Sequence, residues 1–200
     1  MKMLPMKDIW NGVMYLWTLD DSQKRVSTDP LVWDCNTWTV STSLAGCLAN
    51  INMAVYSTDG TRIATVNGDQ TLRMYDSLTG DEITRIPTKH EFDVTCVSFC
   101  QDGALLATGS RDATIRFWDV TTGLLVFSLE EANKDVLAYV SCMCFDHSGT
   151  FLITGCYNCS MKLWNMRTRK CIHTFTDAHT APVLSVTVTE ANASLPACMC

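Results

Sequence analysis

A histidine, a threonine and an aspartate near the middle of the chain are residue types that could cleave a bond by nucleophilic attack. His90 precedes Asp112 by 22 residues, and Thr108 lies four residues before that aspartate. In a hydrolase, such a hydroxyl would pass its proton to the imidazole while the carboxylate held the ring in place. This chemistry needs a hydroxyl that faces a cleft. Whether these residues are catalytic therefore depends on the secondary-structure elements that carry them.

Cysteine pairs are a second candidate for chemistry. Cys156 and Cys159 have the C-x-x-C spacing, and Cys198 and Cys200 lie two residues apart. A metal site usually needs four converging ligands, and a second well-spaced pair does not accompany the first. We therefore expect no metal and no cofactor. Cys96 and Cys142 recur at equivalent positions of two strands, which favours buried packing thiols.

Composition and charge exclude several functions. The chain has 15 basic and 21 acidic residues and a net charge of −6, which argues against a nucleic-acid partner. Its largest basic group, Lys162 with Arg167, Arg169 and Lys170, is too small to reverse this. No run of 18 apolar residues predicts a membrane span, and we expect no signal peptide in this chain of eleven cysteines. We expect a cytoplasmic protein, with a nuclear location as the alternative, and reduced thiols.

The candidate residues belong to an internal repeat. The segment from Tyr56 to Asp76 recurs forty-three residues later as Phe99 to Asp119, and forty-six residues after that as Phe145 to Asn165. Each copy has a turn, a strand-like run with a threonine, a second turn and a run that ends in an aromatic residue and Asp or Asn. The three extra residues fall between Leu129 and Val140, where a longer loop costs little.

Each repeat predicts four short strands. In the middle copy these are Val94–Phe99, Leu105–Ser110, Thr114–Asp119 and Leu124–Leu129. Asp-Gly and Thr-Gly pairs between β-branched and aromatic runs are typical of hairpin turns. A four-stranded sheet with two apolar faces needs a neighbour on each side, and radial repetition of the sheet is one solution.

The period, the four-strand unit and the pair Trp118-Asp119 at the end of a third strand resemble the WD-repeat family over roughly Ile51 to Thr189. The resemblance implies an all-β fold, a β-propeller of four-stranded antiparallel blades that forms an incomplete arc of about three full blades with partial blades on both sides. The expected units are a partial blade with an irregular segment at 1–46, WD blades at 47–88, 89–132 and 133–177, and the start of a further blade at 178–200.

The partial blades rest on spacing. Trp33 lies 42 residues before Tyr75, as the third strand of a preceding blade would, with Thr37–Ser41 as its last strand. A rival alignment assigns this role to Asn11–Trp17, and spacing favours Trp33. Val183–Thr189 predicts another first strand. An open arc leaves the apolar flanks of its end blades exposed, so we expect self-association or additional blades.

The resemblance also implies a different role for His90, Thr108 and Asp112. Members of this family commonly join a histidine, a hydroxyl, an aspartate and a tryptophan in a buried hydrogen-bond network. This implies a structural role for His90, Thr108, Asp112 and Trp118, no catalytic residues and no enzyme activity. The flanking copies have Tyr75 in place of the tryptophan and Asn158 in place of the aspartate. They lack the complete set, and we expect them to be less rigid.

The implied function is a protein-protein interaction scaffold whose partners are other proteins. We expect contacts on the face with the loops before each first strand, made by Phe92, Arg111 and Tyr157, because aromatic and arginine side chains commonly anchor interfaces. The loop Glu130–Ala138 lies on the same side. The alternative is a substrate receptor of a cullin-RING ubiquitin ligase. Trp164-Asn165-Met166-Arg167 resembles the W-D-x-R motif for its adaptor, with Asn in place of Asp and Arg167 as the contact.

Overall fold

The computed structural model describes residues 13–16, 30–34, 37, 39–44, 46, 50–130, 139–176 and 179–188. Every regular element in these ranges is a β-strand, and the strands form four antiparallel sheets. The all-β class and the four-stranded blades predicted from the repeat are confirmed. The same ranges contain no helix with the length and apolar character to cross a bilayer.

The second blade has the strand order β11-β10-β9-β8. The last strand begins one residue later than predicted, because the carbonyl of Leu124 accepts the N–H of Asp119 across the turn. The strands are β8 (Val94–Phe99), β9 (Leu105–Ser110), β10 (Thr114–Asp119) and β11 (Leu125–Glu130).

The blades on either side repeat this arrangement. The first blade contains β4 (Ile51–Tyr56), β5 (Arg62–Asn67), β6 (Thr71–Asp76) and β7 (Glu82–Pro87). The third blade contains β12 (Val140–Phe145), β13 (Phe151–Cys156), β14 (Met161–Asn165) and β15 (Lys170–Phe175).

A three-stranded sheet precedes the first blade. It contains β1 (Val13–Leu16), β2 (Leu31–Asp34) and β3 (Thr39–Ser43), with β2 in the middle. The last strand starts two residues later than predicted, because Thr37 lies in the turn and its N–H points to the Asp34 carboxylate at 3.4 Å. The rival residue Trp17 lies outside the described residues.

A β-bulge recurs at one position in all four sheets. The register between the third and fourth strands shifts just before Trp118, and likewise before Tyr75 and Trp164. In the three-stranded sheet the same shift falls just before Trp33. This agreement places β2 in the third-strand position and favours the alignment on Trp33. β1 and β3 therefore take the second- and fourth-strand positions.

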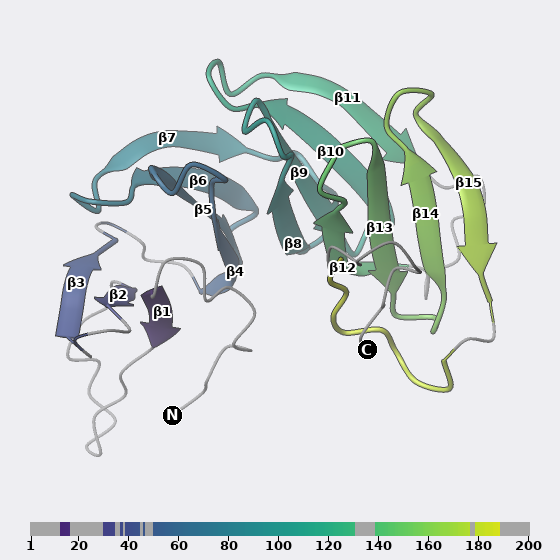
Figure 1. Ribbon diagram of the computed structural model, residues 1–200, viewed down its shortest axis with the longest axis horizontal. Coiled ribbons are helices and arrows are strands. Elements are labelled where there is room, and N and C mark those ends of the chain that lie inside the picture. The colour runs from purple at the N-terminus through teal and green to yellow at the C-terminus, as the bar shows by residue number, and fades with distance from the viewer. Residues whose placement is uncertain are drawn as a thin grey trace.

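The sheets lie side by side in an open arc, with the three-stranded sheet at one end and the third blade at the other (Figure 1). The first strands β4, β8 and β12 contact one another along the row. Buried apolar side chains fill the space between neighbouring blades, and Phe117, Phe145 and Leu152 join the second blade to the third. Each blade thus covers the apolar flank of the next, as the radial arrangement requires.

A hydrogen bond repeats between neighbouring first strands. The Asn52 side chain donates to the Val94 carbonyl at 2.8 Å. One blade further on, the hydroxyl of Thr95 donates to the carbonyl of Val140. Ser141 does the same toward Val183. The row of first strands therefore continues into the segment that contains Val183.

Candidate interaction surface and the network beneath it

The structure joins the four residues of the expected network directly. His90 lies between β7 and β8, and its Nδ1 is 2.9 Å from Oδ2 of Asp112 in the β9–β10 turn. Its Nε2 is 3.0 Å from the Thr108 hydroxyl of β9. The indole N–H of Trp118 on β10 donates to the same hydroxyl at 2.9 Å. One connected set of bonds thus ties the loop before the first strand to the second and third strands.

The proton positions follow from this connectivity. With a proton on Nδ1, His90 donates to Asp112 and accepts the Thr108 hydroxyl at Nε2. Thr114 adds its hydroxyl and backbone N–H to the other carboxylate oxygen of Asp112. Burial by itself raises the pKa of Asp112, but the hydrogen bonds from His90 and Thr114 outweigh it, so the pKa lies below its ordinary value.

This geometry does not suit nucleophilic catalysis. Thr108 is fully buried and His90 is 3% exposed. The Thr108 oxygen already accepts the Trp118 indole N–H, and its proton points to the imidazole. A hydroxyl enclosed in this way meets no substrate, since attack requires an open cleft beside the nucleophile.

The third blade keeps half of the network. The indole N–H of Trp164 donates to the Thr154 hydroxyl at 3.0 Å, as Trp118 does to Thr108. Asn158 accepts the backbone N–H and hydroxyl of Ser160, which holds the β13–β14 turn. The amide therefore replaces the carboxylate in the turn.

The first blade has a network that the sequence did not predict. Arg73 on β6 is 2% exposed and pairs with Asp69 in the β5–β6 turn at 2.5 Å. Its guanidinium also donates to the carbonyl of Gly46 at 2.9 Å and to the Thr71 hydroxyl at 3.0 Å. This arginine thus ties a preceding loop to the turn, the task that His90 performs in the second blade. Arg73 recurs in the second blade as Arg116, whose guanidinium donates to the carbonyl of Thr88 at 2.8 Å, but nothing in the sequence indicated the pairing with Asp69.

Above the His90 network, three side chains form a stacked row that we call the tyrosine row. The guanidinium of Arg111 lies over the Tyr139 ring at 5.7 Å from its centroid. The rings of Tyr139 and Tyr157 are stacked, with centroids 4.6 Å apart and planes at 17°. Arg111 follows β9 and Tyr157 follows β13, so the tyrosine row bridges the second and third blades. Sequence reasoning named Arg111 and Tyr157 but missed Tyr139, which lies just before β12, in the stretch where the repeat spacing changes.

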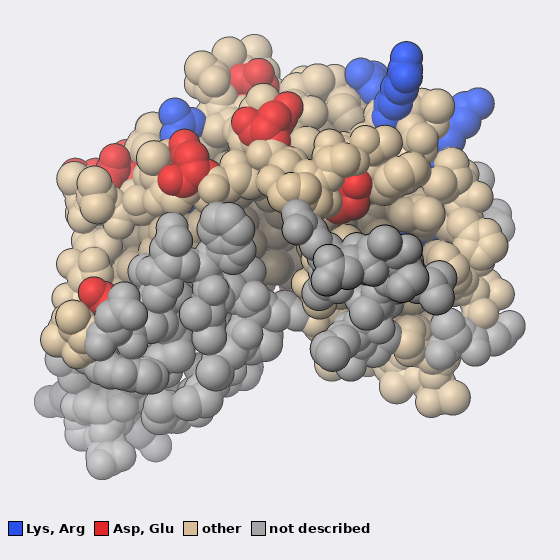
Figure 2. All heavy atoms as spheres, viewed as in Figure 1, with Lys and Arg blue, Asp and Glu red and all other residues tan. Residues whose placement is uncertain are grey.

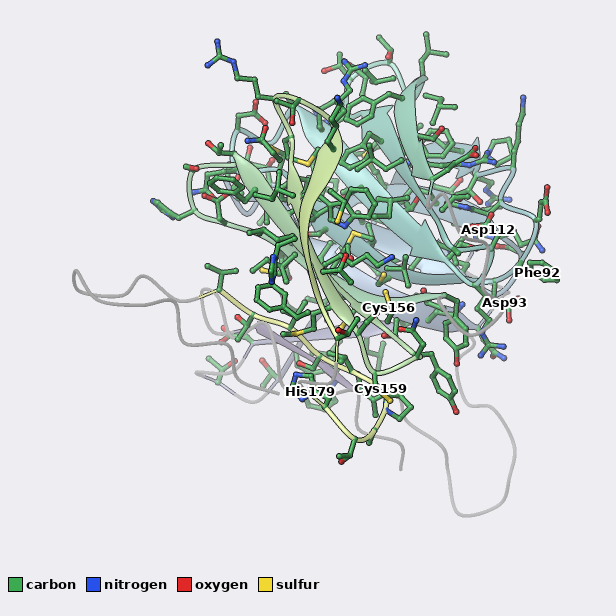
Figure 3. The ribbon with its side chains drawn as sticks, turned by 90° about the vertical axis from the view of Figure 1, so that its right-hand side faces the viewer. Phe92, Asp93, Asp112, Cys156, Cys159 and His179 are labelled. Carbon is green, nitrogen blue, oxygen red and sulfur yellow. The ribbon has the colours of Figure 1, made fainter. Side chains whose placement is uncertain are left out.

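The remaining expected contacts divide between two ends of the sheets. Phe92 is 58% exposed, and its neighbour Asp93 pairs with Arg111 at 3.5 Å. Phe92, Asp93 and Asp112 lie at the same edge of the molecule (Figure 3). Arg167 lies in the β14–β15 turn, at the opposite end of β14 from Tyr157. The structure therefore brings Phe92, Arg111 and Tyr157 to one face and leaves Arg167 away from it. Of the expected loop, residues 131–138 lie outside the described residues.

The two cysteines of the C-x-x-C pair lie in different environments. Cys156 ends β13 and is buried, while Cys159 lies in the turn with φ +66°. Ala113 and Gln70 take the same backbone conformation in the equivalent turns. Burial raises the pKa of the Cys96 thiol, which fits its place in the core between the second and third blades. Among the described residues, no three His, Cys, Asp or Glu side chains converge as metal ligands.

Surface charges are mixed. On the face drawn in Figure 2, Asp and Glu side chains lie toward the middle and left, and Lys and Arg gather mainly toward the upper right. Three exposed basic residues lie at the β14–β15 turn and the start of β15: Arg167, Arg169 and Lys170. Arg169 lies over the Phe127 ring at 4.2 Å from its centroid, a cation–π contact between the second and third blades.

Comparison with protein families finds the repeat itself. The family model for the WD domain, G-beta repeat, matches residues 81–119 and 126–165. Each match starts near the fourth strand of one blade and ends with the third strand of the next, so one sequence repeat spans two blades. No curated protein matches the chain. The repeated four-stranded sheets, their shared bulge and these two matches together show that the chain contains WD repeats.

Proposed function

We propose that this chain is a non-catalytic scaffold that binds other proteins, and that one partner docks on the tyrosine row and Phe92. WD repeats generally mediate protein interactions and typically have no catalytic role. The observation that supports this location is the stacking of Arg111, Tyr139 and Tyr157 across two blades. It presents aromatic and arginine groups, the common anchors of interfaces, on a rigid support.

The tyrosine row is preorganised for binding. Stacking on Tyr139 holds the Tyr157 ring while 41% of this residue stays exposed. A side chain that is already held loses little conformational entropy when a partner covers it. Arg111 is about half exposed and keeps Asp93 beside it, so a polar group flanks the aromatic surface. We infer a partner that buries an apolar or aromatic side chain between Phe92 and Tyr157.

Affinity purification with mass spectrometry tests this location. Tagged wild-type chain, Arg111→Ala, Tyr157→Ala and the control Lys170→Ala are expressed in the same cells. Both row variants should lose a common set of partners, and Lys170→Ala should retain it, because Lys170 lies on β15 away from the row. All three substitutions affect exposed side chains, so the melting temperatures should stay close together. An unchanged partner set in both row variants would refute the proposal.

The ligase-receptor alternative receives no support from the geometry. Asn165 accepts the backbone N–H of Thr168 at 2.9 Å, as Asp119 does for Thr122 at 2.7 Å. The W-N-x-R motif is therefore accounted for by a turn that every blade contains. Recovery of a ligase adaptor with the wild-type chain, and its loss with Arg167→Ala, would reverse this choice.

A further inference from the structure

The β14–β15 turn differs from the equivalent turns of the first two blades at one backbone position. In those blades the position is held by Gly80 and Gly123, with φ of 75° and 68°. In the third blade it is held by Arg169, with φ of 55°. A long side chain is uncommon in this left-handed region, because its Cβ crowds the backbone. The third blade therefore carries an arginine where glycine would relieve the strain.

The Arg169 side chain is held by a stack that begins in the core. The buried ring of Phe117 lies against the ring of Phe127, with centroids 4.2 Å apart and planes at 12°. The guanidinium of Arg169 lies over the Phe127 ring at 4.2 Å from its centroid. Because Phe117 covers one face of Phe127, Arg169 lies on the other face. The stack thus fixes a cation of the third blade against β11 of the second.

The other two turns do not form this stack. A Cβ at Gly80 would lie 2.1 Å from the carbonyl oxygen of Ser43, and one at Gly123 would lie 3.2 Å from Cδ1 of Ile86. In addition, β7 has Thr84 at the position that Phe127 holds on β11. The stacked arginine is therefore particular to the third blade and is not a requirement of the blade fold.

Stacking leaves the edges of the Arg169 guanidinium uncovered by the ring. A guanidinium carries its N–H groups in its own plane, and this fork matches the two oxygens of a carboxylate. Arg169 is exposed, and so is Arg167, which stands where the other blades have Leu78 and Thr121. Ile172, which follows on β15, is 50% exposed and adds an apolar side chain close to both in sequence. The turn therefore presents two cations beside an apolar group.

We propose that Arg167 and Arg169 form a second protein-binding site, which takes a short acidic segment that also carries an apolar side chain. The chain has a net charge of −6, and in Figure 2 the Lys and Arg side chains gather mainly toward the upper right, where Figure 1 shows the β14–β15 turn. Carboxylates are attracted to this turn and repelled by the Asp and Glu side chains elsewhere on the face, which determines where the segment docks. A long polyanion such as a nucleic acid would extend over those acidic side chains, so a short segment of a protein fits better.

This site is separate from the tyrosine row. The β14–β15 turn lies at the opposite end of β14 from Tyr157. Partners that depend on the tyrosine row should therefore co-purify with Arg169→Gly as they do with the wild type, and either proposal can fail alone.

Fluorescence anisotropy with labelled probes tests the chemistry of the occupant. The main probe is a short peptide in which Glu alternates with Leu. The comparison probes are the same peptide with Lys in place of every Glu, and a single-stranded oligothymidylate. The wild-type chain should bind the Glu peptide, more weakly as NaCl increases because salt screens the charges, and should not bind the Lys peptide. Absence of binding to the Glu peptide, equal binding of the Lys peptide, or tighter binding of the oligonucleotide would overturn the proposal.

Arg169→Gly tests the stacked residue. It restores the residue type of Gly80 and Gly123, so the variant should stay folded, with a melting temperature close to that of the wild type. The dissociation constant for the Glu peptide should rise at least tenfold, because the charged hydrogen bonds to the carboxylates are lost. Unchanged affinity in Arg169→Gly would assign the stack to packing alone and contradict the site.

Two further variants complete the test. Arg167→Ala leaves the stack in place and should also weaken binding of the Glu peptide, so the proposal stays open to refutation even where Arg169→Gly changes stability. Arg85→Ala is the control, because it removes the same charge from β7, where Arg85 pairs with Glu82 at 2.8 Å. It should bind the Glu peptide as the wild type does. An equal loss of affinity in Arg85→Ala would show a general charge effect and refute a defined site.

Discussion

At the scale of single residues, neighbouring blades stabilise the same turn with different chemistry. The second blade uses a chain of hydrogen bonds that runs from Trp118 through Thr108 to His90 and Asp112. The first blade uses the guanidinium of Arg73, which reaches Asp69 and the carbonyl of Gly46. In each case a buried polar side chain finds partners on both sides, because an unpaired group would cost stability.

The histidine is the centre of the first of these networks, and its removal should be costly. His90→Ala removes one hydrogen-bond partner from Thr108 and one from Asp112 in a buried site, so we expect a loss of about 1–3 kcal/mol in the free energy of unfolding. Chemical denaturation measures it. His147→Ala is the matched control, since His147 is an exposed histidine in the β12–β13 turn. Equal stability of the two variants would contradict a buried network.

Asp112 should make stability fall in acid. Its pKa in the folded protein lies below the 3.8 of an ordinary aspartate, so its contribution is fully present above that pH and is lost as the pH falls toward the folded pKa. Asp112→Asn should be less stable at pH 7 by about 1–3 kcal/mol and should lose less stability between pH 5 and 2. Denaturation curves at several pH values compare the two slopes, and parallel slopes would argue against the shifted pKa.

At the scale of elements, two glycines on second strands allow neighbouring blades to approach closely. Gly109 on β9 and Gly155 on β13 are equivalent residues, and each faces the first strand of the next blade. A Cβ built on Gly109 would lie 2.6 Å from Cε of Met143 and 2.8 Å from Cγ1 of Val140. These glycines allow neighbouring blades to pack with their first strands in contact.

A methyl group at this position should push the blades apart. We expect Gly109→Ala to lower the free energy of unfolding by about 1–3 kcal/mol, the usual cost of overpacking a core. Gly68→Ala is the control, because its Cβ would lie 3.5 Å from the Asn50 carbonyl oxygen and 3.9 Å from Asn50 Cβ, both ordinary contacts. Thermal denaturation of both variants provides the comparison. Equal melting temperatures would show that the interface yields without strain.

At the scale of the whole molecule, stability comes from contacts between blades. The row of first strands is linked by the bonds from Asn52, Thr95 and Ser141, and apolar clusters fill the space outside it. No blade covers both of its own faces, so each contributes to the stability of its neighbours. Repeat proteins of this kind have stabilities that are approximately sums of unit and interface terms.

Removal of one link should weaken the interface between the second and third blades. Thr95→Val keeps the shape of the side chain but loses the hydroxyl, which bonds the carbonyl of Val140 and also that of Gly109 at 3.1 Å, so we expect about 0.5–1.5 kcal/mol less stability. Thr121→Val, in the exposed β10–β11 turn, is the matched control. Hydrogen exchange should also be faster in both β8 and β12 in Thr95→Val. Unchanged exchange in β12 would mean that this bond does not couple the blades.

Strand positions were predictable because turns and strands leave local signals. The predicted bounds of β8, β9 and β10 agree with the structure, and those of β11 and β3 differ by one and two residues. The deviations arise where Asp119 and Asp34 hold turn backbone that the residue pattern assigned to a strand. Tyr139 escaped prediction because no repeated motif marks it. Arg73 recurs as Arg116, but its pairing with Asp69 and Gly46 joins separate segments and left no local signal.

The sequence by itself determined the period, the four strands of each unit and the identity of the four residues in the His90 network. These are local or repeated properties, set by side-chain alternation and turn chemistry over a few residues. Only the tertiary structure decided that Tyr139 stacks between Arg111 and Tyr157, that Arg73 joins Gly46 to Asp69, and that the row of first strands continues into the segment that contains Val183. Those outcomes depend on how neighbouring blades approach, and the distance between their surfaces is a property of packed sheets rather than of any one segment.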